Sequence, residues 1–139
     1  MSNAELKVED LMSRDVTTVQ RNEQLVVAED VMRLGRIRHL PVLDQDGTLV
    51  GLVSQRDLFH SGVIRALGFG VHAHERAIST LSIKEAMTTD LVTTAPDIPI
   101  RQAAELMIAR KIGCLPVLEN GKLIGILTES DFVAFVART

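Results

Sequence analysis

The chain has little of what several classes of protein require. Among its 139 residues there is one cysteine, Cys114, there is no tryptophan or tyrosine, and there are only four phenylalanines. A lone cysteine excludes an intramolecular disulfide, and we therefore expect a reducing, cytoplasmic setting. So few aromatic side chains leave no platform on which nucleic-acid bases would stack. The net charge of −3, with the two signs interspersed, also argues against a general nucleic-acid binder.

Long apolar runs are absent as well. No stretch approaches the roughly 20 apolar residues that cross a bilayer, and no basic-then-apolar segment marks a secretory signal. We therefore expect neither a membrane span nor export. The hydrophobic fraction of 46% is nevertheless high enough for a packed core. No G-x-S-x-G, H-E-x-x-H or phosphate-loop pattern appears, so nothing nominates an enzyme.

The chain contains an internal repeat. Residues 36–57, RIRHLPVLDQDGTLVGLVSQRD, return at 111–131 as KIGCLPVLENGKLIGILTESD. Pro41 corresponds to Pro116 and Gly51 to Gly125, with one residue fewer in the second turn. A copy of about 55–60 residues is marginal for burying a core alone, so we expect two units that cover one another. Function is then expected in a cleft between the copies or on their shared surface.

The two copies are predicted to have the same order of elements. The first has a short strand at 17–19, a helix at 24–34, strands at 37–43 and 48–53 around a turn at 44–47, and a helix from Ser54. The second has a short strand at 93–94, a helix at 100–110, a hairpin turn at Asn120-Gly121, a return strand at 122–127, and a helix from Thr128. Pro41 suits an edge strand or the end of ladder pairing, and Asp97 is the expected N-cap of the helix at 100–110.

These elements divide the chain into a first copy at 5–62, a connector at 63–82 and a second copy at 83–139. The segments 8–12 and 83–87 begin the two copies in the same way. The connector contains His72 and His74 beside Glu75, which we interpret as solvated residues because no third strong metal ligand is near in sequence.

Two short motifs lie where a strand passes into a helix. Ser54-x-x-Asp57 and Thr128-x-x-Asp131 are each typical of a capping box. The same groups also suit a nucleotide, because a helix N-terminus and a hydroxyl favour a phosphate and a carboxylate accepts from the two hydroxyls of a ribose. The glycine three residues earlier in each copy allows a ligand or a backbone to approach closely. The two interpretations are compatible, and the sequence leaves both open.

The repeated set resembles the cystathionine-β-synthase (CBS) domain family, whose tandem pair is called a Bateman module. The motifs that carry the resemblance are Leu40-Pro41-Val42, Asp44 with Gly47, and 51–57, together with Leu115-Pro116-Val117, Glu119 with Gly121, and 125–131. The starts Met12…Asp15 and Met87…Asp90 also fit. The resemblance implies an α/β (or α+β) fold of two pseudo-symmetric repeats, each a three-stranded sheet with two helices.

The resemblance also implies a function. Modules of the family bind adenosine-containing ligands in clefts between the repeats, and binding regulates an attached or associated protein. We therefore expect a non-enzymatic, cytoplasmic regulator that senses AMP, ADP or ATP, with NAD or S-adenosylmethionine as further ligands. Modules of the family often pair, so a homodimer and a separate regulated protein are the expected partners.

Residue roles follow from the resemblance. Asp57 and Asp131 would hold the ribose, and Ser54 and Thr128 would contact phosphate. Arg38, His39 and Arg56 would add phosphate contacts in the first copy. The base would be bordered by Thr17, Thr18, Ile37, Val92, Thr93, Thr94 and Ile112, while Pro41 and Pro116 shape the strands. Each of these residues also has an ordinary structural interpretation, as a strand former, a solvated cation or a core side chain.

The second copy departs from the first. Gly113 and Cys114 replace Arg38 and His39, and Ser130 replaces Arg56. The first cleft therefore has more charge directed at phosphate, and the second is expected to take a less charged ligand, a nucleoside end, or nothing. Arg110, Lys111 and Lys122 offer at most partial compensation. Cys114, in an apolar strand without a basic neighbour in sequence, is interpreted as a packed thiol.

Three alternatives remain. One is a ligand-free module for protein interaction and dimerisation. The second is a regulatory subunit of a separate metabolic enzyme or transporter, which co-purification of that partner would reveal. The third is nucleic-acid binding through a basic groove around Arg36, Arg38 and Arg56, for which steep salt dependence would be the signature.

Overall fold

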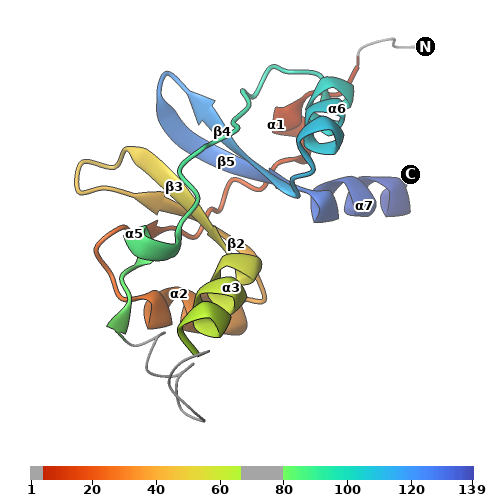
Figure 1. The fold of residues 1–139 in the computed structure, drawn as a ribbon. Helices are drawn as coiled ribbons and strands as arrows, with labels where there is room; N and C mark the ends of the chain where they lie inside the picture. Colours follow the sequence, from red (N-terminus) through yellow and green to blue (C-terminus); the bar gives the residue numbers. More distant parts are fainter. Residues whose placement is uncertain (1–4, 67–79) are drawn as a thin grey trace. The chain divides into compact units, whose positions relative to one another are not determined.

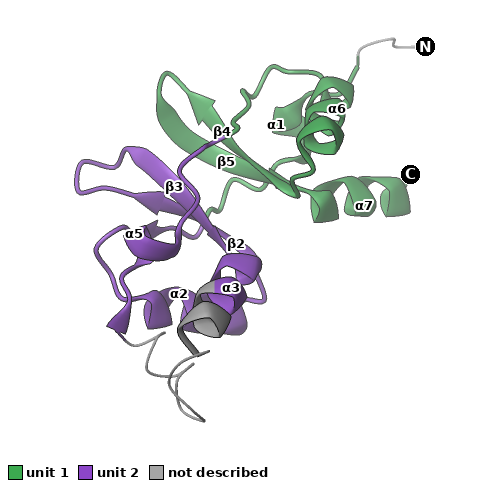
Figure 2. Cartoon of the chain, viewed as in Figure 1, with its two compact units in different colours: residues 1–16, 92–139 green, residues 17–91 purple. Residues whose placement is uncertain are grey.

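The computed structural model describes residues 5–66 and 80–139, which fold into two compact units (Figures 1 and 2). Unit 1 comprises residues 1–16 and 92–139, and unit 2 comprises residues 17–91. Each unit combines helices with a small sheet, which confirms the predicted α/β class. Within the described ranges, no helix is long and apolar enough to cross a membrane.

Unit 2 contains a three-stranded sheet in the order β1-β2-β3. Strand β1 runs parallel to β2, and β3 runs antiparallel to β2 on its other side. The elements are β1 (Val19–Gln20), α2 (Leu25–Gly35), β2 (His39–Leu43), β3 (Leu49–Ser54), α3 (Gln55–Ala66) and α5 (Ile83–Ala86). Helix α2 begins the core with Leu25, Ala28 and Met32, whose spacing places them on one face of the helix. These side chains pack with Leu40, Val42 and Val53 of the sheet.

Unit 1 repeats this plan with a two-stranded sheet. Its elements are α1 (Val8–Leu11), α6 (Ile100–Arg110), β4 (Cys114–Glu119), β5 (Lys122–Thr128) and α7 (Glu129–Arg138). Ala103 and Met107 of α6 pack with Leu115, Val117 and Leu127 of the sheet, as the corresponding residues do in unit 2. Antiparallel pairing of β4 and β5 is irregular after Val117, at the position that corresponds to the irregularity after Val42.

The first segment of each copy packs with the strands of the other copy. Helix α1 contacts α6, α7 and β5 in unit 1, and α5 contacts α2, α3 and β3 in unit 2. Ser13 exchanges two backbone hydrogen bonds with Ile126, of 2.9 and 3.0 Å, and Thr88 exchanges two with Leu52, of 2.8 and 3.0 Å. Val8 and Ile83, fully buried, fill corresponding places in the two cores. Neither core is therefore built from one continuous stretch of sequence.

We call residues 6–13 and 81–88, which pack with the other copy in this way, the exchanged segments. Their contacts correct the N-cap predicted for α6. Pro99, not Asp97, is the N-cap residue, and its side chain makes no capping hydrogen bond. The N–H of Ile100 donates instead to the carbonyl of Leu6 at 2.9 Å. The carbonyl of Leu6, in the exchanged segment, therefore accepts the helix-end N–H for which the sequence predicts Asp97 as the partner. In unit 2 the N–H of Leu25 donates in the same way to the carbonyl of Leu81 at 2.7 Å.

The two short first strands differ from their prediction. Strand β1 begins at Val19, so Thr17 and Thr18 precede it. In unit 1 the corresponding pairing shrinks to one bridge between Thr94 and Val117. The physical reason is proline: Arg21 donates its N–H to Leu43 at 3.1 Å, whereas the residue at the corresponding position, Pro96, has no N–H to donate.

Pro41 does not lie at an edge, because β2 is the central strand of its sheet and Pro41 pairs with Leu52. The corresponding Pro116 indicates how a proline is tolerated there. The carbonyl of Pro116 accepts the N–H of Thr94 at 3.0 Å, so Thr94 lies on the side of Pro116 that lacks an N–H. Thr94 is paired with β4 through a single bridge, and no ladder of hydrogen bonds there requires the proline to donate. Both prolines are among the fully buried side chains of the cores.

The predicted hairpins are confirmed. Strand β4 ends at Glu119 and β5 begins at Lys122, so Asn120 and Gly121 form a two-residue loop. Both have positive φ, of 54° and 79°, as a type I′ turn requires. In unit 2 the N–H of Asp44 donates to Thr48 at 3.0 Å across the longer turn, in which Gly47 has φ 87°.

Gly51 and Gly125 make room for the exchanged segments. A Cβ on Gly51 would lie 2.9 Å from Cγ of Met87, and one on Gly125 would lie 2.6 Å from Sδ of Met12 and 3.0 Å from the carbonyl oxygen of Ser13. The sequence predicts that each glycine allows a close approach by a ligand or by a backbone. In the structure, a methionine and the backbone of the exchanged segment approach each glycine.

We expect Gly51→Ala and Gly125→Ala each to lower the free energy of unfolding by about 1–3 kcal/mol, because the added methyl overpacks the exchanged segment. Chemical denaturation measures this directly. Gly35→Ala is the matched control: its nearest contact is a flexible Ile37 side chain at 3.6 Å, so stability should be unchanged or slightly raised. Loss of stability in Gly35→Ala, with none in Gly51→Ala and Gly125→Ala, would contradict the role of Gly51 and Gly125 in making room for the exchanged segments.

Candidate functional site

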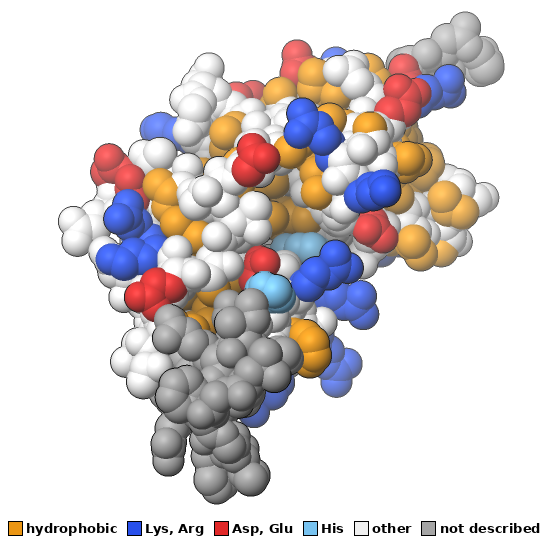
Figure 3. All heavy atoms as spheres, in the orientation of Figure 1, with side chains coloured by type: hydrophobic (Ala, Val, Ile, Leu, Met, Phe, Trp, Pro, Cys, Tyr) orange, Lys and Arg blue, Asp and Glu red, His pale blue; other side chains and the backbone are white. Residues whose placement is uncertain are grey.

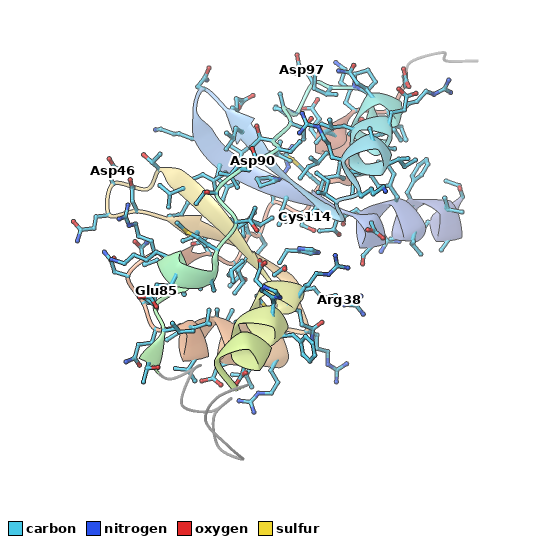
Figure 4. All side chains as sticks on the ribbon, in the orientation of Figure 1. Arg38, Asp46, Glu85, Asp90, Asp97 and Cys114 are labelled. Atoms are coloured by element: carbon cyan, nitrogen blue, oxygen red, sulfur yellow. The ribbon has the colours of Figure 1, made fainter. Side chains whose placement is uncertain are left out.

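In each unit, about half of the predicted site residues lie at one corner, where the first long strand begins and the return strand passes into the last helix. We call these the unit 2 corner (Arg38, His39, Ser54, Arg56 and Asp57) and the unit 1 corner (Gly113, Cys114, Thr128, Ser130 and Asp131). Figure 4 labels Arg38 and Cys114, one from each corner.

In the unit 2 corner, the first residue of α3 is tied to the start of β2. The N–H of Gln55 donates to the carbonyl of Arg38 at 2.9 Å, and His39 is the cross-strand neighbour of Ser54. The Arg38 and Arg56 side chains are exposed, whereas Ser54 and Asp57 are partly buried. Arg38 directly precedes β2 and Arg56 lies in the first turn of α3, so the corner has two exposed cationic residues.

Ser54 and Asp57 form the predicted capping box. Asp57 Oδ2 accepts the N–H of Ser54 at 2.8 Å and its hydroxyl at 3.0 Å, and the N–H of Asp57 donates to Ser54 Oγ at 3.1 Å. None of the hydrogen bonds found among the described residues uses Asp57 Oδ1. The box thus fixes the carboxylate through one oxygen and leaves the second to accept from another group.

The unit 1 corner repeats this backbone arrangement. The N–H of Glu129 donates to the carbonyl of Gly113 at 3.1 Å, and Cys114 is the cross-strand neighbour of Thr128. Asp131 Oδ2 accepts the N–H of Thr128 at 2.8 Å and its hydroxyl at 3.3 Å, which closes the second capping box. The frame is therefore preserved while the side chains around it change.

The residues predicted to border a base lie outside the corners. Ile37 packs on the core of unit 2, and Val92 and Ile112 pack on the core of unit 1. Thr17 and Thr18 lead into β1, and Thr93 precedes the bridge at Thr94. Core packing thus accounts for the two isoleucines and Val92, and a contact with a base stays a prediction.

Sequence reasoning missed Gln55 and Glu129, the first residues of α3 and α7. Each is tied to the strand start of its corner, and the two differ in charge. The signal was available in the repeat, because the copies align without a gap from Gly51 and Gly125 onward.

Metal ligation has no support in the part of the chain that is described, where no group of three or more His, Cys, Asp or Glu is arranged to hold an ion. His72, His74 and Glu75 lie outside the described residues. On the face seen in Figure 3, basic and acidic side chains are interspersed over the described surface, as the composition indicated.

Cys114 is a buried thiol. Burial, with a smaller contribution from the negative charge of Asp131, raises its pKa to about 12. The thiol is therefore protonated at neutral pH, and thiolate is the reactive form.

We expect the native protein at pH 8 to react with an aromatic disulfide reagent at least roughly 100-fold more slowly than the same chain in urea, where the thiol regains an ordinary pKa near 8.5. Absorbance of the released thiolate reports both rates. Equal rates in the native and unfolded protein would contradict the burial of Cys114.

Comparison with known proteins identifies the family. The model of the CBS domain matches twice, at residues 8–63 and 83–138. A CBS domain-containing protein of Dictyostelium discoideum is 32% identical over 91% of this chain and 88% of its own length. Homoserine O-acetyltransferase of Methanohalobium evestigatum is 34% identical over 89% of this chain, which spans only 23% of that enzyme.

Solved structures give the same result. The chain superposes with a TM-score of 0.82 on AcuB, a candidate acetoin utilization protein of Vibrio cholerae, at 36% identity over 96% of this chain and 92% of the other. It superposes with a TM-score of 0.77 on the CBS domain pair of protein MJ0100, at 25% identity over 96% and 98% of the two chains. That pair was crystallised with 5′-methylthioadenosine and S-adenosyl-L-methionine. The chain belongs to the CBS domain family, of which it contains a tandem pair.

Proposed function

We propose that this CBS pair is a non-enzymatic regulatory module that senses adenosine nucleotides of the AMP, ADP and ATP class, with a ribose-binding carboxylate at each of its two corners. The observation that carries the proposal is the pair of capping boxes, each with a carboxylate fixed by its own helix start. The solved pair with 5′-methylthioadenosine and S-adenosyl-L-methionine supports an adenosine-containing ligand, since it shares this fold.

The chemistry of a corner suits a nucleotide. A carboxylate held through Oδ2 presents Oδ1 for the ribose hydroxyls without further loss of side-chain freedom. The hydroxyl of Ser54 or Thr128 and the helix start behind it favour a phosphate. Arg38, His39 and Arg56 add charge-assisted or polar contacts in unit 2. Thr17, Thr18, Thr93 and Thr94, with Ile37, Val92 and Ile112, would border the base.

Regulation follows if the ligand binds two conformations of the module with different affinity, because binding then shifts their populations. The relatives support a regulatory role. Homoserine O-acetyltransferase and inosine-5′-monophosphate dehydrogenase contain a matching segment within a much longer chain, of which it makes up 23% in each case. The regulated partner here is proposed to be a separate enzyme or transporter, or a further part of the same protein.

A second candidate function is a docking module that needs no small ligand. Phe59 of α3 and Val133 of α7 occupy corresponding positions, and each is 68% exposed. Large apolar side chains exposed in the same place in both copies favour a protein contact, including one between two copies of the chain. Thermal shifts with AMP, ADP, ATP, NAD and S-adenosylmethionine separate the candidates. A ligand at about 100 times its Kd adds about 2.7 kcal/mol, or several degrees, whereas no shift with any of them favours docking.

We expect Asp57→Asn to weaken binding of the ligand found in this panel by at least about tenfold, or about 1.4 kcal/mol, because an amide is a poorer acceptor for the ribose. Isothermal titration calorimetry measures the change. Asp10→Asn is the matched control, since Asp10 Oδ2 accepts the N–H of Lys7 at 2.7 Å in a capping box outside the corners. Unchanged affinity in Asp57→Asn, or an equal loss in both variants, would contradict the ribose assignment for unit 2.

A further inference from the structure

The two corners have the same backbone frame and opposite charge. Strand start and helix start are joined by corresponding hydrogen bonds, from Gln55 to Arg38 at 2.9 Å and from Glu129 to Gly113 at 3.1 Å. The strand residue beside each capping hydroxyl is also equivalent, His39 in one unit and Cys114 in the other. A ligand seated in the same way would therefore meet different side chains.

The charge is compared at five corresponding positions, four from each corner as defined and the first residue of the helix that follows, and three of the five differ in charge. In unit 2 they are occupied by Arg38, His39, Gln55, Arg56 and Asp57. In unit 1 they are occupied by Gly113, Cys114, Glu129, Ser130 and Asp131. With histidine neutral, the net charge is +1 in unit 2 and −2 in unit 1.

Neighbouring cations do not cancel this difference. Arg36 and Lys111 occupy the same left-handed position after α2 and α6, with φ of 54° and 55°, and each carries one positive charge, so they do not distinguish the two units. Lys122 pairs with Glu119 beside the hairpin loop, at the far end of β5 from the unit 1 corner. Arg110 remains as the one additional cation in the last turn of α6.

A phosphate would experience these charges directly. In unit 2 two exposed arginines are available, Arg38 just before β2 and Arg56 in the first turn of α3, and guanidinium groups bind phosphate through charge-assisted hydrogen bonds. In unit 1 a phosphate would face two carboxylates at the helix start and find no basic group among the five positions. Like charges at close range oppose binding.

The unit 1 corner is suited to an uncharged group instead. Cys114 is 3% exposed and protonated at neutral pH, and Gly113 adds no side chain beside it. Because Cys114 is buried, the charged groups at this corner are Glu129 and Asp131, and a thioether or alkyl substituent on the 5′ carbon of adenosine would avoid the repulsion that they exert on a phosphate. Asp131 keeps the position and hydrogen bonds of Asp57, so the ribose contact would be conserved.

We infer that the two corners bind adenosine ligands of different charge: unit 2 a ligand with a 5′ phosphate, and unit 1 a ligand with an uncharged 5′ substituent. This inference rests on the proposed function. It assigns Arg38, Arg56, Glu129 and Ser130 as the residues that determine specificity.

The test is calorimetry on the full chain with two probes, AMP and 5′-methylthioadenosine. We expect each to bind at one site per chain, with AMP affinity falling steeply as salt is raised and 5′-methylthioadenosine affinity nearly constant. Arg56→Ser, which places the residue of unit 1 in unit 2, should lower AMP affinity about tenfold and leave 5′-methylthioadenosine within about twofold. Arg101→Ser, which removes an equal charge from α6, should change neither.

The reverse exchange locates the second ligand. Ser130→Arg with Glu129→Gln should allow AMP to bind at a second site, while Asp131→Asn should weaken 5′-methylthioadenosine and spare AMP. AMP affinity that falls with Asp131→Asn and not with Arg56→Ser would overturn the inference, as would equal binding of both probes at both sites. These outcomes leave adenosine binding itself intact. Absence of binding by either probe and by the wider panel would overturn the proposed function together with the inference.

Discussion

Two pairs of backbone hydrogen bonds, between Ser13 and Ile126 and between Thr88 and Leu52, are the constraint on which the rest of the structure depends. They attach the first segment of each repeat to the return strand of the other. The same segments bury Val8 and Ile83 and supply the carbonyls that receive the first N–H groups of α6 and α2. Because each core is completed by a segment distant in sequence, one repeat alone lacks part of its own core. The small size of a single copy makes that dependence severe.

At the corners, the structural motif and the proposed binding role use the same atoms. The capping boxes begin α3 and α7 and at the same time hold Asp57 and Asp131 in one orientation. Side chains that do not contribute to the box or the core, such as Arg38, Arg56 and Ser130, are exposed. Exposed positions accept substitution at little cost in stability, so the charge of each corner changes between the copies while the fold does not.

Local patterns predicted most elements and both corners. The helix at 100–110, the Asn120-Gly121 turn and both capping boxes are found as expected, because each depends on residues close in sequence. The failures involve distant partners. Asp97 is not the N-cap of α6, because the carbonyl of Leu6 accepts the N–H of Ile100. Pro41 lies in a central strand and not at an edge, and the neighbouring strand β1 is too short to require a hydrogen bond from it. A repeat reveals two copies, but its pattern does not show which copy receives each first segment.

The most direct test of the account is a two-dimensional amide NMR titration of the full chain with AMP. We predict that saturable shifts occur at the amides of His39 and of Gln55 through Asp57, and not at those of Glu129 through Asp131. Saturable shifts confined to the unit 2 amides would establish that a nucleotide binds where the capping box holds its carboxylate. If these amides remain unmoved while AMP binds elsewhere, or does not bind, then the corners are helix caps alone and the account is contradicted.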